Sequence, residues 1–417
     1  MNPETNPEIK SQVLGEELKK WPHQIGVGDC RISPRQRRYI TKVLDSNRLT
    51  YGPMSQQFEA EFAKTHGKRF AVFCNSGTSA LHICLAILKE REGWENRDEV
   101  IIPALTFVAD LNVVLHNQLK PVFVDVHPQY YTLDVEKLEQ AITPRTRAII
   151  PVHTFGLPAE MEPIMQLAQR HGIKVIEDVC ESGFVSYRGK PVGSIGDLSC
   201  FSTYQAHLIT TGVGGLTLTD DPDLAALVRS MVNHGRDSIY LKMDDDQGQS
   251  EGKFREIIER RFNFVRLGHS FRATELEAAL GLAALHDGMK EVIVKRNQIA
   301  RYFISKLEPY AEYLQLPTVP SYSEHAFMMF PLVVRGDRFR RDELVQYLEE
   351  HNIETRYMLP LINQPYVLER FGDLGFKYPV SSRVNQNGFY IGCHDHLTQK
   401  EMDFVMAVFA QFFTERG

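Results

Sequence analysis

The 417-residue chain is poor in cysteine and carries little excess charge. Its six cysteines are scattered, and no two of them have the C-x-x-C spacing of a zinc or compact iron–sulfur motif. The 47 basic and 53 acidic residues leave a net charge of -6, which gives no general attraction to nucleic acid or anionic membranes. We therefore expect reduced thiols, no metal and no nucleic-acid partner.

Long apolar runs are also missing. None approaches the roughly 20 residues of a membrane span, and residues 1–12 are polar, unlike the apolar core of a signal peptide. We expect a cytoplasmic protein that does not enter a membrane. The length suits two domains: we expect an N-terminal segment over 1–49 that packs with the small domain, a large domain over 50–285 and a small domain over 286–417.

Short apolar runs alternate with amphipathic stretches between about residues 50 and 285. The expected strands are 69–74, 99–104, 121–126, 148–153, 174–179 and 198–203, and the expected helices between them are 79–92, 134–142 and 160–172. This alternation predicts an α/β fold with a mostly parallel sheet flanked by helices. A long helical pattern over 274–307 leads into residues 325–415, which predict a smaller α+β domain.

Three short motifs carry polar residues where predicted strands end. Ser76, Gly77 and Thr78 stand between a strand and a helix, where exposed N–H groups bind phosphate or where serine simply caps the helix. Asp178 lies near the end of the strand expected over 174–179. Its carboxylate can contact a ligand there or form an ordinary salt bridge. His207 precedes a glycine-rich turn at 211–215, and a lone histidine is more often structural than catalytic.

Together these motifs resemble the DegT/DnrJ/EryC1/StrS family of nucleotide-sugar aminotransferases. The matching stretches include LTYGPMSQQFEAEFAKTHGKRFAVFCNSGTSAL, IIPALTFVADLNVVLHNQLKPVFVDV, VNHGRD, GHSFRATELEAALGLAAL and IETRYMLPLINQP, in this order. The resemblance implies the type I aminotransferase fold, with a mostly parallel seven-stranded sheet. It also implies pyridoxal or pyridoxamine phosphate as the cofactor, and a homodimer with its sites at the subunit interface.

The resemblance assigns cofactor contacts to eight residues. Ser76, Gly77, Thr78 and Ser202 are expected at the phosphate, Phe107 over the pyridine ring, Asp178 at the ring nitrogen, Glu181 beside the phenolic oxygen, and Ser270 near the partner subunit's phosphate. At position 270 the family usually has an asparagine, which reaches further than a serine. At position 181 it usually has a glutamine, so Glu181 would share one proton with the phenol.

The main departure from the family pattern is His207. Aminotransferases of the family have at this position the lysine that tethers the cofactor aldehyde, which an imidazole cannot do. The same change marks the nucleotide-sugar 3-dehydratases, and the chain resembles the GDP-4-keto-6-deoxymannose 3-dehydratase branch. Other histidine dehydratases use an iron–sulfur cluster with a C-x-C pair. This chain has no such pair, and Cys180 and Cys200 are 20 positions apart, which favours a cluster-free route.

The resemblance predicts a 3-dehydratase of deoxysugar biosynthesis, as in lipopolysaccharide O-antigen. With untethered pyridoxamine phosphate it would remove the C3 hydroxyl of an NDP-4-keto-6-deoxyhexose to give a 4-keto-3,6-dideoxyhexose. His207 would transfer the protons, and an amino donor such as L-glutamate would restore the cofactor. Candidate substrate contacts are Tyr204, Arg236, Arg356 and His394. An aminotransferase with untethered cofactor and a non-catalytic binding protein stay open as alternatives.

Overall fold

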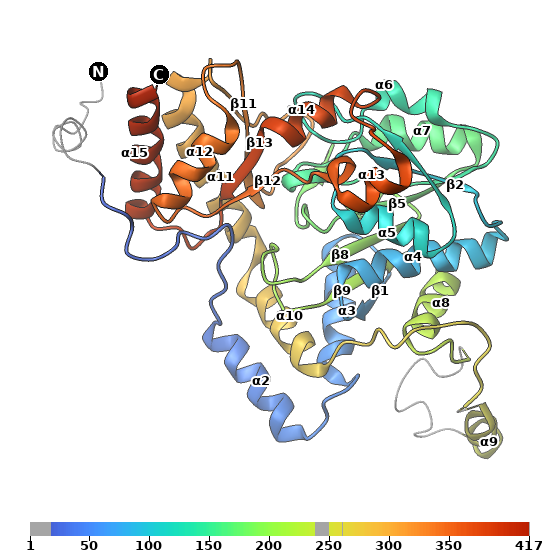
Figure 1. The fold of residues 1–417 in the computed structure, drawn as a ribbon. Helices are drawn as coiled ribbons and strands as arrows, with labels where there is room; N and C mark the ends of the chain where they lie inside the picture. The colour runs from blue at the N-terminus through green and yellow to red at the C-terminus, as the bar shows by residue number, and fades with distance from the viewer. Residues whose placement is uncertain (1–17, 238–249, 261, 417) are drawn as a thin grey trace.

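The computed structural model describes residues 18–237, 250–260 and 262–416. Its larger sheet has seven strands in the order β1-β9-β8-β5-β4-β2-β3 (Figure 1). The strands are β1 (Phe70–Cys74), β2 (Glu99–Pro103), β3 (Lys120–Val124), β4 (Thr146–Ile149), β5 (Lys174–Asp178), β8 (Leu198–Ser202) and β9 (Gly215–Thr219). From β8 to β3 all neighbours pair in parallel, whereas β9 is antiparallel to both β8 and β1. The predicted mostly parallel sheet is confirmed.

Helices cover both faces of this sheet because side chains along a strand point alternately to its two sides. On one face, Ile101 belongs to a core cluster with residues of α3 (Pro53–Thr65), α7 (Met161–His171) and α10 (Glu275–Asp287). On the other face, Val100 and Ile102 belong to a second cluster with residues of α4, α5 and α8. These helices span Gly77–Glu92 (α4), Val108–His116 (α5) and Pro222–Val232 (α8).

The continuous helix expected over 274–307 is instead two helices, α10 and α11 (Met289–Leu307). Gly288 separates them with φ 103°, a conformation that an L-residue rarely adopts. The expected helix over 134–142 is also interrupted: α6 covers Val135–Leu138, and a 3₁₀ turn, η1, follows over Glu139–Ala141. The apolar periodicity located both segments, but not the breaks in their backbone.

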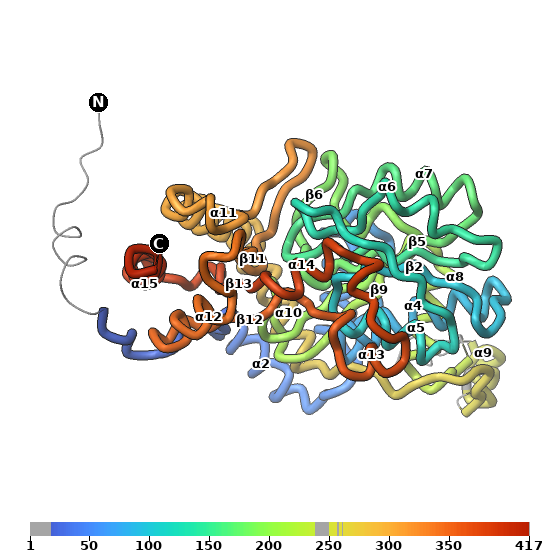
Figure 2. Tube along the Cα trace, turned by 45° about the horizontal axis from the view of Figure 1, so that its top comes forward, coloured from blue at the N-terminus to red at the C-terminus, as the bar shows by residue number. Residues whose placement is uncertain are grey.

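A second, antiparallel sheet has the strand order β10-β11-β13-β12. Its strands are β10 (Leu314–Gln315), β11 (Met329–Val334), β13 (Gly388–Gly392) and β12 (Thr355–Tyr357). Figures 1 and 2 show this sheet beside α11, α12 (Arg341–Glu350) and α15 (Gln399–Arg416), at one end of the molecule. Phe303, Phe330 and Phe409 are fully buried in their common core. This arrangement is the α+β unit that the C-terminal sequence predicts.

Shorter elements complete the described chain. They are α2 (Pro34–Ser46), η2 (Thr154–Gly156), β6 (Ser186–Tyr187), β7 (Lys190–Pro191), α9 (Glu251–Arg260), η3 (Glu308–Tyr310), η4 (Leu361–Asn363), α13 (Pro365–Phe371) and α14 (Pro379–Asn387). Before α2, Ile25 pairs with Ile353 next to the small sheet, whereas α2 itself packs on α10. The domain limits at 49/50 and 285/286 stay predictions.

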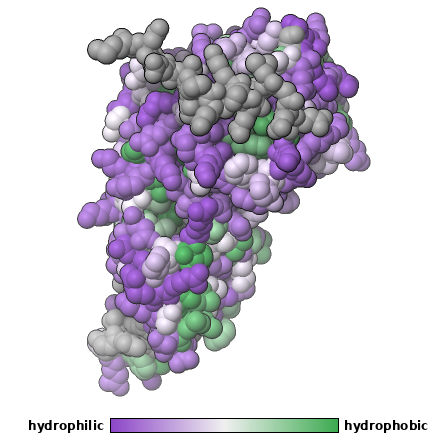
Figure 3. Space-filling model, turned by 90° about the vertical axis from the view of Figure 1, so that its left-hand side faces the viewer, coloured by the Kyte–Doolittle hydropathy of each residue, from purple (hydrophilic) through white to green (hydrophobic). Residues whose placement is uncertain are grey.

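The molecular surface is mainly hydrophilic on the face shown in Figure 3, with apolar side chains gathered toward its lower part. Within the described ranges, no helix has both the length and the apolar character that crossing a bilayer requires.

Candidate active site

The start of α4 packs directly against the ends of two neighbouring strands. Ser76 is the N-cap of α4, and its Oγ accepts a hydrogen bond of 3.0 Å from Ser79 N. At Gly77, an added Cβ would lie 2.7 Å from Ser202 Cβ and 3.0 Å from Cys180 Sγ, closer than side chains normally approach. Position 77 therefore requires glycine, and the cradle left by the missing side chain opens at a helix N-terminus, where anions bind well.

The two acidic residues at the end of β5 have different surroundings, because they point to opposite faces of the sheet. Glu177 is fully buried and accepts hydrogen bonds from Gly193 N, Ile195 N and Gly196 N at 2.6–2.8 Å. Those bonds make it a structural residue. Asp178 is at the carboxyl end of β5, where its Oδ1 accepts a 2.9 Å hydrogen bond from Cys180 N.

His207 lies on the loop between β8 and β9, which folds back on itself. Thr203 and Thr211 close this loop through a 2.6 Å hydrogen bond between their hydroxyls, and His207 N donates to Tyr204 O at 2.9 Å. Burial lowers the pKa of the imidazole to about 4, although Asp178 and the carbonyls of Cys180 and Ser202 act in the opposite direction. His207 is therefore neutral at pH 7 and can accept a proton.

The same loop is joined to the start of α4 by glycine contacts. An added Cβ at Gly215 would collide with the Ser76 carbonyl, and one at Gly214 would collide with Thr203 Oγ1. Gly77, Asp178, Cys180, Ser202 and His207 thus form one continuous cluster, which we call the His207 pocket. The structure brings together the predicted phosphate, ring-nitrogen and proton-transfer residues within a single chain.

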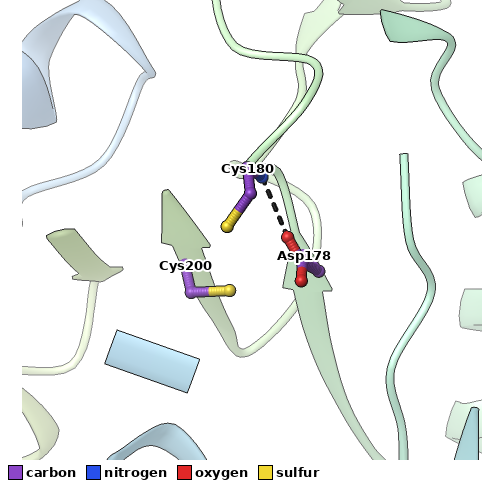
Figure 4. Close-up of side chains that lie close together, drawn as sticks. All are labelled: Asp178, Cys180 and Cys200. Atoms are coloured by element: carbon purple, nitrogen blue, oxygen red, sulfur yellow. Dashed lines mark hydrogen bonds between the residues drawn. The ribbon is translucent and has the colours of Figure 1, made fainter. Parts of the chain in front are cut away.

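Two cysteines form one wall of the His207 pocket. The Sγ atoms of Cys180 and Cys200 and a carboxylate oxygen of Asp178 all lie within 4.8 Å of one another (Figure 4). A hydrogen bond with Cys200 lowers the pKa of the Cys180 thiol, but burial and Asp178 outweigh it and raise the pKa to about 12. Burial also raises the pKa of the Cys200 thiol. The two thiols pack beside the Asp178 carboxylate at the ends of β5 and β8.

Cys180 and Cys200 lie close together although 20 positions separate them along the chain, because parallel pairing of β5 and β8 sets Asp178 opposite Cys200. The separation along the chain therefore does not support the cluster-free route, which stays a prediction. The absence of a C-x-C pair still holds. Two cysteines are fewer than the four ligands that an iron–sulfur cluster commonly takes.

Glu181 and Tyr204 border the His207 pocket, and Phe107 stands at the start of α5. Glu181 Oε2 accepts a hydrogen bond of 2.6 Å from Phe155 N, and burial raises the pKa of its carboxyl to about 7. The Phe107 side chain at the start of α5 is 57% exposed, so a face of its ring is available for stacking. Tyr204 is equally open and meets the His207 ring edge-on, with centroids 6.1 Å apart.

Other predicted contacts lie elsewhere in the chain. Arg236 and Ser270 line a separate cavity of about 600 Å³, together with Tyr51, Arg229 and Arg272; we call it the arginine cavity. In it, Arg272 Nη2 donates to Ser270 Oγ at 3.2 Å. Its lining includes neither Asp178 nor His207, so one chain does not unite the two sets of residues.

Thr78, Arg356 and His394 complete the predicted set. Thr78 is exposed and lines a third cavity, of about 930 Å³, with His82 and His269. Arg356 on β12 pairs with Glu354, and burial lowers the pKa of His394 to about 4. In the described part of the chain, none of these three side chains has a hydrogen bond or ion pair with a residue of the His207 pocket, and their proposed substrate or cofactor contacts stay predictions.

Sequence reasoning missed Asp110, which lies next to Asp178. Asp110 is in the first turn of α5, is 1% exposed, and its Oδ2 accepts a hydrogen bond from Thr106 Oγ1. Burial and the neighbouring Asp178 raise its pKa well above the usual range of an aspartate. The available signal was an acidic residue inside the otherwise apolar VADLNVVLH stretch.

The His207 pocket has the parts that a phosphorylated pyridine cofactor needs. Gly77 leaves an anion cradle at the N-terminus of α4, Asp178 supplies a carboxylate, and the exposed Phe107 ring can cover a flat ligand. His207 Nδ1 is buried and has no hydrogen-bond partner among the described residues, which is costly unless a ligand satisfies it. The residues present fit the cofactor that the sequence predicts.

Residues 31–410 match the DegT/DnrJ/EryC1/StrS aminotransferase family, and the chain belongs to this family. It is 32% identical over 391 residues to GDP-perosamine synthase of Caulobacter vibrioides, covering 93% of this chain and 98% of that protein. It is also 32% identical over 384 residues to dTDP-4-dehydro-2,6-dideoxy-D-glucose 3-dehydratase of Saccharopolyspora spinosa, with 88% and 81% covered.

Among solved structures, the chain is similar to the GDP-4-keto-6-deoxy-D-mannose-3-dehydratase of E. coli, determined with bound hydrated PLP. The TM-score is 0.83 at 27% identity, and 93% of this chain and all of that chain are covered. The predicted type I aminotransferase fold is confirmed. The relatives include both a dehydratase and a synthase of an amino sugar, so family membership alone leaves the reaction open.

Proposed function

We propose that the protein is a nucleotide-sugar 3-dehydratase that uses pyridoxamine and pyridoxal phosphate without a covalent tether. It would remove the C3 hydroxyl of an NDP-4-keto-6-deoxyhexose and yield a 4-keto-3,6-dideoxyhexose. The observation that carries the proposal is His207, a neutral, half-buried imidazole beside Asp178, at the position where the family has its tethering lysine. An imidazole there can transfer protons but cannot hold the cofactor aldehyde.

Different residues of the His207 pocket would bind the cofactor phosphate, contact the cofactor ring and transfer protons. The cofactor would supply an amine and an electron-withdrawing ring. Ser76, Gly77 and Ser202 would bind its phosphate, and Phe107 would lie against the ring. Asp178 would keep the ring nitrogen protonated. His207, neutral at the start, would take a proton from the carbon next to the ring and return it to the departing C3 hydroxyl.

Glu181 would hold the proton beside the phenolic oxygen. Because the pKa of the Glu181 carboxyl is about 7, this carboxyl is mostly protonated below pH 7. A protonated carboxyl can donate to a phenolate, whereas an ionised one would repel it. The backbone N–H of Phe155 orients the other carboxyl oxygen through its 2.6 Å hydrogen bond.

The proposal includes a homodimer with shared sites. The segment that leads to Ser270 exposes several apolar side chains: Phe262 is 80% exposed and Leu267 is 94% exposed. Exposed apolar surface of this kind marks association sites. A second copy would cover it and bring the arginine cavity to the partner's His207 pocket, where Arg236, Ser270 and Arg272 would meet anionic groups of substrate or cofactor. The cytoplasmic location expected from the sequence stays a prediction.

The alternative is an aminotransferase that uses the same untethered cofactor, and the similarity to GDP-perosamine synthase favours it. Both reactions need Asp178 and His207, so the product must decide. We would incubate the protein with pyridoxamine phosphate, L-glutamate and a panel of NDP-4-keto-6-deoxyhexoses, and analyse the products by mass spectrometry. Loss of the C3 oxygen supports dehydration. Gain of nitrogen with the oxygen retained would overturn the proposal, as would an unchanged sugar across the panel.

A further inference from the structure

The segment over residues 269–272 separates two cavities. It makes β-bridges at Ser270, with the residue after α8, and at Arg272, with the end of β1. Side chains along such a segment point alternately to its two sides. His269 and Phe271 line the cavity of about 930 Å³, which we call the histidine cavity, whereas Ser270 and Arg272 line the arginine cavity. A contact that holds the first pair of side chains therefore also places the second pair.

His82 of α4 holds this segment from the histidine cavity. Its Nε2 lies 3.2 Å from His269 Nε2, and the two rings meet edge-on with centroids 4.9 Å apart. The His269 ring in turn stacks on Phe271, with centroids 4.4 Å apart. Burial lowers the pKa of both imidazoles, that of His82 to about 4, so both rings are neutral at pH 7. Of the two facing nitrogens, one must therefore donate and the other accept.

The side chain of Asn117 decides which nitrogen donates. Asn117 Nδ2 donates to Val113 O at 2.8 Å, which fixes the orientation of the amide, and it lies 3.3 Å from His82 Nδ1. Because an amide nitrogen only donates, His82 Nδ1 must accept in this contact, and the proton of the ring is on Nε2. His82 Nε2–H therefore donates to His269 Nε2, and the proton of the neutral His269 ring is on Nδ1.

We propose that His82 is a positioning residue: its Nε2–H holds His269 and thereby sets Ser270 and Arg272 in the arginine cavity, where they contact an anionic group of the ligand. The inference rests on the proposed function of the arginine cavity, and it is the same for a dehydratase and for an aminotransferase. It also connects that cavity with the cofactor cradle, because α4 begins at the cradle and has His82 in its second turn.

Two other side chains of the histidine cavity contribute less to holding the segment. Arg266 Nε donates to Glu90 Oε1 of α4 at 2.9 Å, but Glu90 is exposed, and an ion pair at the surface stabilises little. His116 of α5 has its ring centroid 6.3 Å from that of His82 and, among the described residues, no hydrogen bond with the segment. The hydrogen bond between His82 and His269 is therefore the better-protected link between α4 and the segment.

Four variants separate this hydrogen bond from the bulk of the side chains. His82→Gln keeps a donor close to the position of the ring Nε2, His82→Leu has no donor, and His269→Leu has no acceptor. His116→Leu is the matched control, because it makes the same change in the same cavity away from the segment. Hydrogen exchange of residues 265–273 in the full chain, expressed as protection factors, measures how firmly the segment is held.

Loss of the hydrogen bond should loosen the segment. At pH 7, His82→Leu and His269→Leu should each lower the protection factors by about fivefold, and the double variant should lower them no further. His82→Gln and His116→Leu should keep the wild-type values. The inference is overturned if His82→Gln is as loose as His82→Leu, if the two leucine variants add, or if His82→Leu is unchanged. Should His82→Leu not fold, His269→Leu decides.

The positions of the two ring protons can be measured directly. In a wild-type protein with ¹⁵N-labelled histidine, the spectrum at pH 7 should show His82 protonated on Nε2 and His269 on Nδ1. The signals are assigned by their loss in His82→Gln and His269→Leu. A proton on Nδ1 of His82 would overturn the inference.

A binding measurement tests the connection to the arginine cavity, with pyrophosphate as the anionic probe and the protein loaded with pyridoxamine phosphate. In calorimetry, His82→Leu should raise the Kd for pyrophosphate by about fivefold and change that for pyridoxamine phosphate by less than about twofold. His82→Gln should bind pyrophosphate as the wild type does. Equal pyrophosphate affinities in His82→Leu and the wild type would overturn the positioning role. Arg272→Ala that binds pyrophosphate like the wild type would instead contradict the proposed function of the arginine cavity.

Discussion

The His207 pocket and the arginine cavity differ in how much of a site one chain completes. In the pocket, Gly77 lies against Ser202 and Cys180, Asp178 accepts a hydrogen bond from Cys180 N, and His207 is close enough to Asp178 to feel its charge. The cavity has an open volume of about 600 Å³ between three arginines, one of which, Arg236, lies over the ring of the strongly exposed Phe262. The proposed proton transfer and phosphate binding thus use residues of one chain, whereas the arginines would contact the ligand of a partner subunit.

The largest expected effect is in the pocket. His207→Asn keeps a polar side chain of similar size but removes the base. Turnover should fall by roughly 10²–10⁴-fold, while the Kd for pyridoxamine phosphate, measured by fluorescence titration, should change only a few-fold because His207 is not a tether. A parallel loss of cofactor affinity would mean that His207 mainly holds the cofactor.

Gly77→Ala tests the cradle of the same pocket. The added methyl group would lie 2.7 Å from Ser202 Cβ, so the start of α4 must move away from β8. We expect the Kd for pyridoxamine phosphate to rise by about tenfold or more, since displaced N–H donors lose strength steeply with distance. Gly252→Ala, where nothing lies within 4 Å of the added Cβ, is the control. Equal affinities in the two variants would contradict the assignment.

Mixed dimers test whether the arginine cavity completes the partner's pocket. Arg272→Ala and His207→Asn homodimers should each be nearly inactive. Half of the dimers in an equal mixture would contain both subunit types, and each would have one undamaged site, so about a quarter of wild-type activity should return. Activity that stays at the level of the separate variants would place both residues in the site of one chain.

Leu267→Glu tests the exposed apolar surface itself. The added charge should reduce dimer formation, as measured by light scattering.

The smallest effect concerns pH. Because the raised pKa of Glu181 is about 7, its carboxyl is protonated below this pH and ionised above it. If the protonated form donates to the phenolic oxygen, turnover should decline as pH rises through about 7. Glu181→Gln, a permanent donor, should remove this decline but leave the loss at low pH, where the imidazole of His207 becomes protonated near pH 4. A decline that persists in Glu181→Gln would assign it to another group.

The resemblance to the family assigned most of the pocket residues, and hydrophobic periodicity placed two of them where an expected strand ends or an expected helix begins. Asp178 at the end of β5 and Ser76 at the start of α4 are of this kind. The closeness of Cys200 to Asp178 was not predicted because it comes from the pairing of β5 with β8. The burial of Asp110 was not predicted because it comes from the packing of α5. The break at Gly288 was missed because the helical pattern continues on both sides of a single residue.

The central claim is that the cofactor has no covalent tether in this protein. We would load the wild type and His207→Lys with pyridoxal phosphate, reduce both with borohydride and measure intact-protein mass. The account predicts an unchanged mass for the wild type and the addition of one pyridoxyl phosphate group per chain for His207→Lys. A wild-type protein that gains this group on one of its own lysines would contradict the account.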